Sequence, residues 1–185
     1  MALARTASGN DMESVWEWIE AAKALKRQYV IFALDGKAST LLGEKGEPFF
    51  YEPDEEEAGE PVPSNSREGI MRAIAMTRKA LRSGQSLLLI EDHVDLYRKD
   101  FWLPDSVDLV FLSTLQTQEK GCDQQLKPGA MALRSNKKVD LFLSHLWALL
   151  QQRETTLAYA TKHLAFHSAF TPILSTHVLP LVPPK

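Results

Sequence analysis

Residues 87–102 have the sequence LLLIEDHVDLYRKDFW, in which four apolar residues are followed at once by an acidic cluster of Glu91, Asp92, His93 and Asp95. A short leucine and isoleucine run bounded by polar residues is typical of a strand buried on both faces of a sheet. The acidic residues therefore follow the carboxyl end of a predicted strand. Ligands bind at that edge in open α/β sheets, so we expect the functional site there.

Extended and helical segments alternate on both sides of this strand. Residues 29–34, 108–112 and 129–133 are short apolar runs that predict further buried strands. Amphipathic stripes follow Asn10, Asn65 and Asn136, and each of these residues is suited to cap a helix. The alternation predicts an α/β fold, a three-layer α/β/α sandwich with a mainly parallel sheet.

Length and composition favour a single domain over residues 1–185, because 185 residues with 44% hydrophobic content can bury one core. Residues 52–66 contain six acidic side chains and several prolines and serines, which predicts a solvated, flexible loop. A metal site in this run is disfavoured because it lacks an EF-hand scaffold. Residues 172–185 predict an extended C-terminal tail.

Charge and hydropathy exclude several classes of partner. The net charge is −3 and the basic residues are scattered, which argues against nucleic-acid binding. No segment approaches the roughly 20 apolar residues of a membrane span, and the N-terminus has no signal-peptide core. We therefore expect a soluble chain without an anchor. The single cysteine, Cys122, rules out an internal disulfide framework.

The acidic cluster after residue 90 is the main candidate for chemistry. Two carboxylates at a strand end can hold Mg²⁺ or Mn²⁺, which takes its other oxygens from water and substrate phosphates. Alternate residues of a strand share a face, but the partner position of Asp92 is Val94. Asp95 lies on the same face as Asp92 only if the chain turns. The alternative is that Asp92 and Asp95 cap the loop or the following turn.

Two other patterns are weaker. Asp35 also lies at a strand exit, in FALDGKASTLL, but a haloacid-dehalogenase-type phosphatase needs an acid where Ala33 stands. His163 and His167 have helical i, i+4 spacing, but a zinc protease of the HExxH class needs Glu in place of Leu164. We interpret this pair as a helix face.

Four segments, in order, resemble the nucleotide-diphospho-sugar transferase family, glycosyltransferases with a GT-A-type fold. In that family the second segment is an early strand ending in Asp, the third carries a metal-binding DxD motif, and the fourth leads into a helix. The resemblance covers about residues 4–150. The segments are RTASGN (5–10), YVIFALD (29–35), LLLIEDHVDLYRKDFW (87–102) and GAMALRSNKKVDLFLSHLWALL (129–150).

The resemblance implies transfer of a sugar from a nucleotide-diphosphate donor to a glycan or protein acceptor, with Mn²⁺ or Mg²⁺ as cofactor. Asp92 falls on the first Asp of DxD and Val94 on the second, while Asp95 would substitute through a local bulge. Asp92 and Asp95 would then hold the metal. Asp92 would also bind the donor, and Asp35 would lie near its nucleotide. No catalytic base is identified, and such relatives usually work in the Golgi lumen behind a membrane anchor.

Val94 also motivates an alternative from another functional class. A catalytically degenerate glycosyltransferase-fold protein would keep the sandwich as a binding or interaction module without transferring a sugar. A soluble α/β protein with unrelated chemistry is the third possibility.

Overall fold

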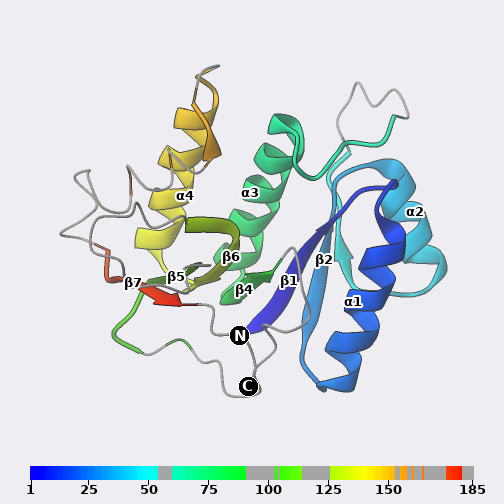
Figure 1. Cartoon of the computed structure of the whole chain (residues 1–185), viewed down its shortest axis with the longest axis horizontal. Coiled ribbons are helices and arrows are strands. Elements are labelled where there is room, and N and C mark those ends of the chain that lie inside the picture. Colours follow the sequence, from blue (N-terminus) through cyan, green and yellow to red (C-terminus); the bar gives the residue numbers. More distant parts are fainter. Residues whose placement is uncertain are drawn as a thin grey trace.

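The computed structural model describes residues 1–53, 60–90, 103, 105–113, 126–152, 155–157, 160, 164 and 174–180. Within them, seven strands form one sheet in the order β3-β2-β1-β4-β6-β5-β7 (Figure 1). The strands are β1 (Ala2–Ala7), β2 (Tyr29–Ala33), β3 (Phe49–Phe50), β4 (Leu87–Ile90), β5 (Leu109–Ser113), β6 (Leu126–Leu133) and β7 (Thr176–Pro180).

The sheet is mainly parallel, as expected from the sequence. Strand β6 pairs antiparallel with both of its neighbours, β4 and β5. The other four pairings are parallel. The mixed α/β class and the predominance of parallel strands are therefore confirmed.

In the part of the chain that the structure describes, helices α1 to α4 cover the two faces of the sheet. Helices α1 (Met12–Ala24) and α2 (Gly36–Glu44) pack on one face, and α3 (Arg67–Arg82) and α4 (Lys137–Leu150) pack on the other (Figure 1). Neighbouring strand residues point to opposite faces. On β2, Ile31 therefore packs in the α1/α2 core and Phe32 in the α3/α4 core. The described elements thus form an α/β sandwich.

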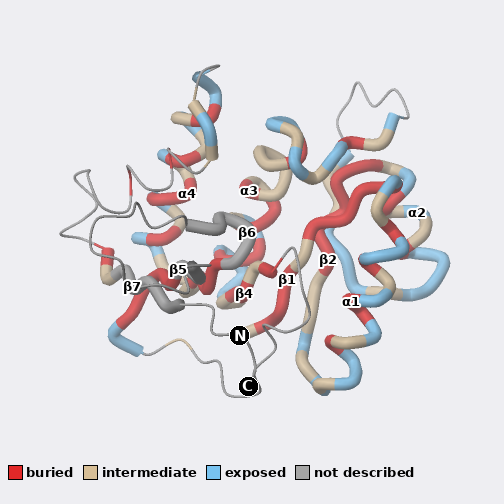
Figure 2. The backbone as a smooth tube through the Cα atoms, in the orientation of Figure 1, coloured by how far each residue is buried: buried red, intermediate tan, exposed pale blue. Residues whose placement is uncertain are grey.

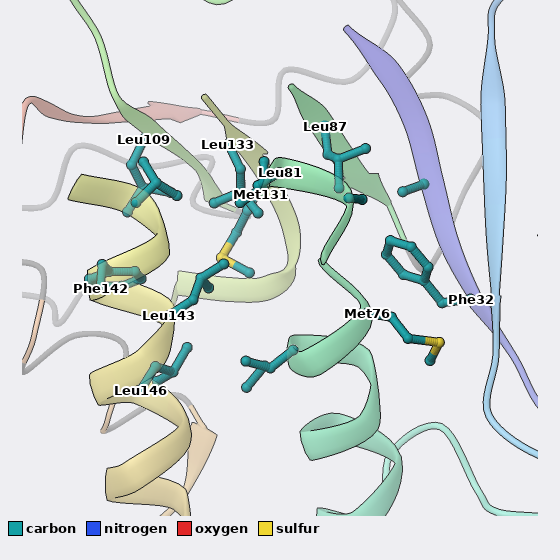
Figure 3. Close-up of a cluster of buried hydrophobic side chains, with 14 of the residues drawn as sticks. Phe32, Met76, Leu81, Leu87, Leu109, Met131, Leu133, Phe142, Leu143 and Leu146 are labelled. Carbon is teal, nitrogen blue, oxygen red and sulfur yellow. The ribbon is translucent and has the colours of Figure 1, made fainter. Parts of the chain in front are cut away.

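Strands β1, β2 and β4 are largely buried, whereas β3 is exposed and the helices are half-exposed (Figure 2). In the α3/α4 core, Leu109 of the sheet lies on the side of Phe142 in α4, and Leu87 lies on the side of α3 (Figure 3). This arrangement explains the sequence pattern, because a strand buried on both faces is apolar throughout whereas a covering helix is apolar on one stripe.

Helix caps follow the sequence closely. Asn136 accepts a hydrogen bond from the N–H of Val139 at 2.9 Å, which confirms the predicted cap of α4. The caps of α1 and α3 lie one residue beyond the predicted positions, at Asp11 and Ser66. Ser66 Oγ accepts from the N–H of Gly69 at 3.0 Å and donates to the carbonyl of Pro63 at 2.7 Å. A serine with both roles fixes the preceding turn as well as the helix.

Two segments predicted as irregular are partly ordered. The acidic loop predicted over residues 52–66 extends beyond the described residues at 54–59, but Val62 is buried and residues 63–66 form a hydrogen-bonded turn. In the predicted extended tail, residues 176–180 form β7, which pairs with β5. Among the described residues, no helix has both the length and the apolar character that crossing a membrane requires.

Candidate functional site

The order of the strands creates a crevice at the carboxyl end of β1. From β1 the chain passes through α1 to β2 and then to β3 on one side, and it returns through α3 to β4 on the other side of β1. Helices α1 and α3 lie on opposite faces of the sheet. Such a reversal separates the connections above the strand ends and leaves room for a ligand. Residues 8–11, between β1 and α1, occupy this position.

A polar groove of about 410 Å³ opens at this point. One wall is β1 with the loop that follows it and the first turn of α1, and the other is the turn before α3. We call it the β1 groove, and its lining residues are Arg5, Thr6, Ser8, Asn10, Asp11, Ser14, Pro63, Ser64 and Asn65. Hydroxyl, amide, guanidinium and carboxylate groups therefore line a single concave surface.

The carboxylate of Asp35 holds the two walls together. Asp35 is 3% exposed and caps α2 by accepting from the N–H of Ala38 at 2.8 Å. Its Oδ2 also accepts from Ser8 Oγ at 3.1 Å and from the N–H of Gly9 at 3.0 Å, both in the loop after β1. The same oxygen accepts from the N–H of Val62 at 3.1 Å, beside the turn before α3. One buried carboxylate thus anchors both walls of the β1 groove.

The wall before α3 is packed as well as hydrogen-bonded. A Cβ added to Gly69 would lie 2.3 Å from the carbonyl oxygen of Pro63, so only glycine allows the turn to lie against the helix. Arg72, one turn further along α3, donates to the carbonyl of Leu34 at 2.7 Å and forms an ion pair with Glu68. These contacts fix α3 against the end of β2, and they fix the position of Ser64 and Asn65 in the groove.

Arg5 and Asp11 are the charged residues among those that line the β1 groove. The guanidinium of Arg5 donates to the carbonyl and to the hydroxyl of Ser14, at 3.0 and 2.7 Å. Asp11 Oδ1 accepts from the N–H of Ser8 at 2.7 Å. Burial raises the pKa of Asp11, and the Ser8 hydrogen bond and the charge of Arg5 offset this effect only in part. The groove is thus a partly desolvated environment in which a carboxylate is less favourable than in water.

Of the predicted site residues, Asp35 lies beside the β1 groove. Its oxygens are already occupied by four protein donor groups, so its place is in the framework of the groove. Asp92 and Asp95 lie outside the described residues, although β4, which precedes them, is next to β1. The sequence predictions treated Asn10 and Asn65 as helix caps and did not name Arg5 as a site residue. The RTASGN segment contains Arg5 and Asn10, and its polar residues at the end of β1 and directly after it were the available signal.

Within the described ranges, no three His, Cys, Asp or Glu side chains are grouped so that they could hold a metal ion. No family model matches this chain, and no curated protein sequence matches it. Function is therefore inferred from the β1 groove together with the sequence resemblance.

Proposed function

We propose that this protein is a GT-A-like glycosyltransferase that takes a sugar from a nucleotide-diphosphate donor bound in the β1 groove. The observation that carries the proposal is the polar groove at the carboxyl end of β1, where the strand order reverses. Open α/β sheets bind nucleotides at this position. The RTASGN segment, one of the four that resemble the nucleotide-diphospho-sugar transferases, lines one wall of the groove.

The lining residues suit a sugar nucleotide. Arg5 supplies a guanidinium, whose planar donors pair with phosphate oxygens. Asn10 and Asn65 supply amides from opposite walls, and each amide can donate to and accept from a sugar hydroxyl or a base edge. Asp35 acts as a positioning residue, because it fixes both walls of the groove and its carboxylate oxygens already accept hydrogen bonds from protein donors.

A divalent cation belongs to this proposal. Asp92, with Asp95, would hold Mn²⁺ or Mg²⁺, whose charge would stabilise the departing diphosphate. Both residues follow β4 in the sequence, and β4 pairs with β1. The family resemblance implies a glycan or a protein as the acceptor.

Titration calorimetry with UDP and with GDP tests donor binding, with and without Mn²⁺. We expect saturable binding that Mn²⁺ strengthens, and at least tenfold weaker binding in Asp92→Ala, Asn10→Ala and Asn65→Ala. Gln28→Ala is the matched control, because Gln28 is an exposed amide residue at the opposite edge of the sheet. Absence of heat with either nucleotide overturns the proposal, and so does equal weakening by the control.

Val94 supports a second candidate, a degenerate member that binds without transferring. The valine replaces the second Asp of DxD, so the metal would lose one carboxylate. Val94→Asp separates the candidates. Metal-dependent sugar-nucleotide hydrolysis that is gained in Val94→Asp and absent from the parent identifies the degenerate protein, whereas hydrolysis or transfer by the parent identifies the enzyme.

A further inference from the structure

A second cavity, of about 250 Å³, adjoins the β1 groove and has a different character. It lies between α3 and α4 above the sheet, and its walls are predominantly apolar. We call it the interhelix cavity. Its lining residues are Ser64, Asn65, Ile70, Ala73, Ile74, Thr77, Leu89, Met131, Leu143, Leu146 and Leu157.

Central strands form the floor of this cavity. Leu89 of β4 and Met131 of β6 are directly paired across the sheet, and both face α3 and α4. Figure 3 shows the Met131 side chain directed toward Leu143. Leu87 on the same face of β4 is fully buried, whereas Leu89 keeps accessible surface. A leucine on a central strand that faces the core is normally fully buried. The accessible surface of Leu89 therefore indicates a space in the core that side chains do not fill.

The two helices above the cavity are held at both ends. Near the start of α4, Asp140 accepts from Arg78 at 2.9 Å and pairs with Arg82 at 2.9 Å. At the other end of α4, Arg67 of α3 donates through Nε to the carbonyl of Leu150 at 2.6 Å. These links span α3 and α4 on either side of the cavity. They oppose the helix movement that would close it.

The cavity and the β1 groove meet at Ser64 and Asn65, which line both. At Ser64 and Asn65, a ligand that extends from the groove into the cavity would pass from polar walls to apolar walls. We propose that the interhelix cavity binds the apolar part of the acceptor, which would then be a small hydroxylated molecule that carries one aromatic ring or a branched alkyl group, in place of the glycan or protein that the resemblance implies. Its hydroxyl would remain at Ser64 and Asn65, facing the donor. This inference rests on the proposed function.

The volume and the lining support a group of this size. An apolar cavity of about 150 Å³ accommodates benzene in a well-characterised case, so about 250 Å³ accommodates a substituted ring. Burial of such a ring against leucine, isoleucine and methionine is favourable in proportion to its area. The polar group of Thr77, which is 2% exposed, is the buried hydroxyl in the wall and offers one orienting contact.

Benzyl alcohol is the probe, and the experiment needs neither nucleotide nor metal. In protein with ¹³C-labelled methionine methyl groups, we expect a saturable shift of the Met131 resonance and little change at Met76, which lies in the same core but does not line the cavity. Ala73→Leu fills the cavity and should reduce the affinity at least tenfold. Ala148→Leu, on the exposed face of α4, is the matched control and should not change it.

A second variant keeps the test decisive if Ala73→Leu does not fold. Ile70→Ala widens the cavity and should let 2-naphthylmethanol bind at least fivefold more tightly than in the parent. An unmoved Met131 resonance, or equal affinity in all variants, overturns the inference. If UDP and GDP do not bind, the proposed function is refuted, but the Met131 resonance should still shift with benzyl alcohol. A failure of the donor proposal can therefore be distinguished from a failure of the cavity proposal. If nucleotide binds and benzyl alcohol does not, the donor proposal stands and the cavity proposal is refuted.

Discussion

The carboxylate of Asp35, at the end of β2, accepts a hydrogen bond from the backbone N–H of Val62 at 3.1 Å. The same carboxylate binds the loop after β1 and the first turn of α2. Two chain segments that are distant in sequence therefore depend on one buried side chain for the shape of the β1 groove.

We expect Asp35→Ala to lower the free energy of unfolding by roughly 3–5 kcal/mol, because several buried donors lose their acceptor. Urea denaturation followed by far-UV circular dichroism measures the change. Asp105→Ala is the control, because Asp105 is fully exposed and its contact with Arg134 is 3.7 Å, and it should leave the free energy of unfolding essentially unchanged. Similar losses in both variants would show that Asp35 does not hold the groove walls.

Gly69 allows the turn before α3 to lie against the helix. Gly69→Ala should destabilise the protein by about 2–3 kcal/mol, because its Cβ would meet the backbone of Pro63. Gly43→Ala in α2 has nothing closer than 3.9 Å and should be neutral or stabilise by about 0.5–1 kcal/mol. Thermal unfolding of both variants tests the contrast, and a stable Gly69→Ala protein would contradict the packing described for this turn.

Arg5 supplies the cation of the β1 groove, so Arg5→Gln should weaken nucleotide-diphosphate binding about tenfold, equivalent to about 1.4 kcal/mol. The loss should shrink for the uncharged nucleoside, because the guanidinium acts on phosphate. Calorimetry with UDP and with uridine makes the comparison. Arg27→Gln, at the amino-terminal edge of the sheet, is the matched control and should not change the affinity. Equal losses for UDP and uridine would assign Arg5 a structural role only.

Asp140 of α4 forms ion pairs with Arg78 and Arg82 of α3, and these ion pairs should weaken at low pH. Burial alone would raise its pKa, but the hydrogen bonds and charges of Arg82 and Arg78 lower it below 3.8. A lowered folded-state pKa means that the stabilisation is present above the unfolded value and is lost as the pH falls through the folded value. Asp140→Asn should cost about 1 kcal/mol at pH 7 and progressively less as the pH falls below the usual aspartate range, as denaturation curves at a series of pH values would show. A cost that is independent of pH would contradict this account.

Asp11 should behave in the opposite sense. Burial raises its pKa above 3.8, so its contribution to stability is complete below that value and is lost as the pH rises through the folded pKa. Asp11→Asn keeps an oxygen for the N–H of Ser8 and removes the buried charge. The variant should therefore gain in relative stability between pH 3 and pH 7. A relative loss over that interval would show that the Arg5 charge outweighs burial.

Local signals predicted strands β2, β4, β5 and β6 and helices α1, α3 and α4, but they missed the central strand β1, whose ALARTA sequence is not a continuous apolar run. Asn136 caps α4 as expected, because capping depends on a spacing of three residues that is visible in the chain. The antiparallel direction of β6 was not predictable, because a short apolar run has the same composition in either direction. Asp35 shows the limit for sites. An aspartate after a strand and before a helix suits a ligand contact or a helix cap equally, and only the tertiary partners Ser8, Gly9 and Val62 distinguish the two.

The pairing of β7 with β5 also affects how this fold forms during synthesis on the ribosome. Val110 lies beside His177, so β5 emerges from the exit tunnel well before its outer partner exists. At about 5–20 residues per second the nascent chain spends several seconds with that edge open. An uncovered apolar edge strand is a template for pairing with other chains. Factors that shield nascent chains would therefore act on this protein chiefly in the interval between synthesis of β5 and synthesis of β7.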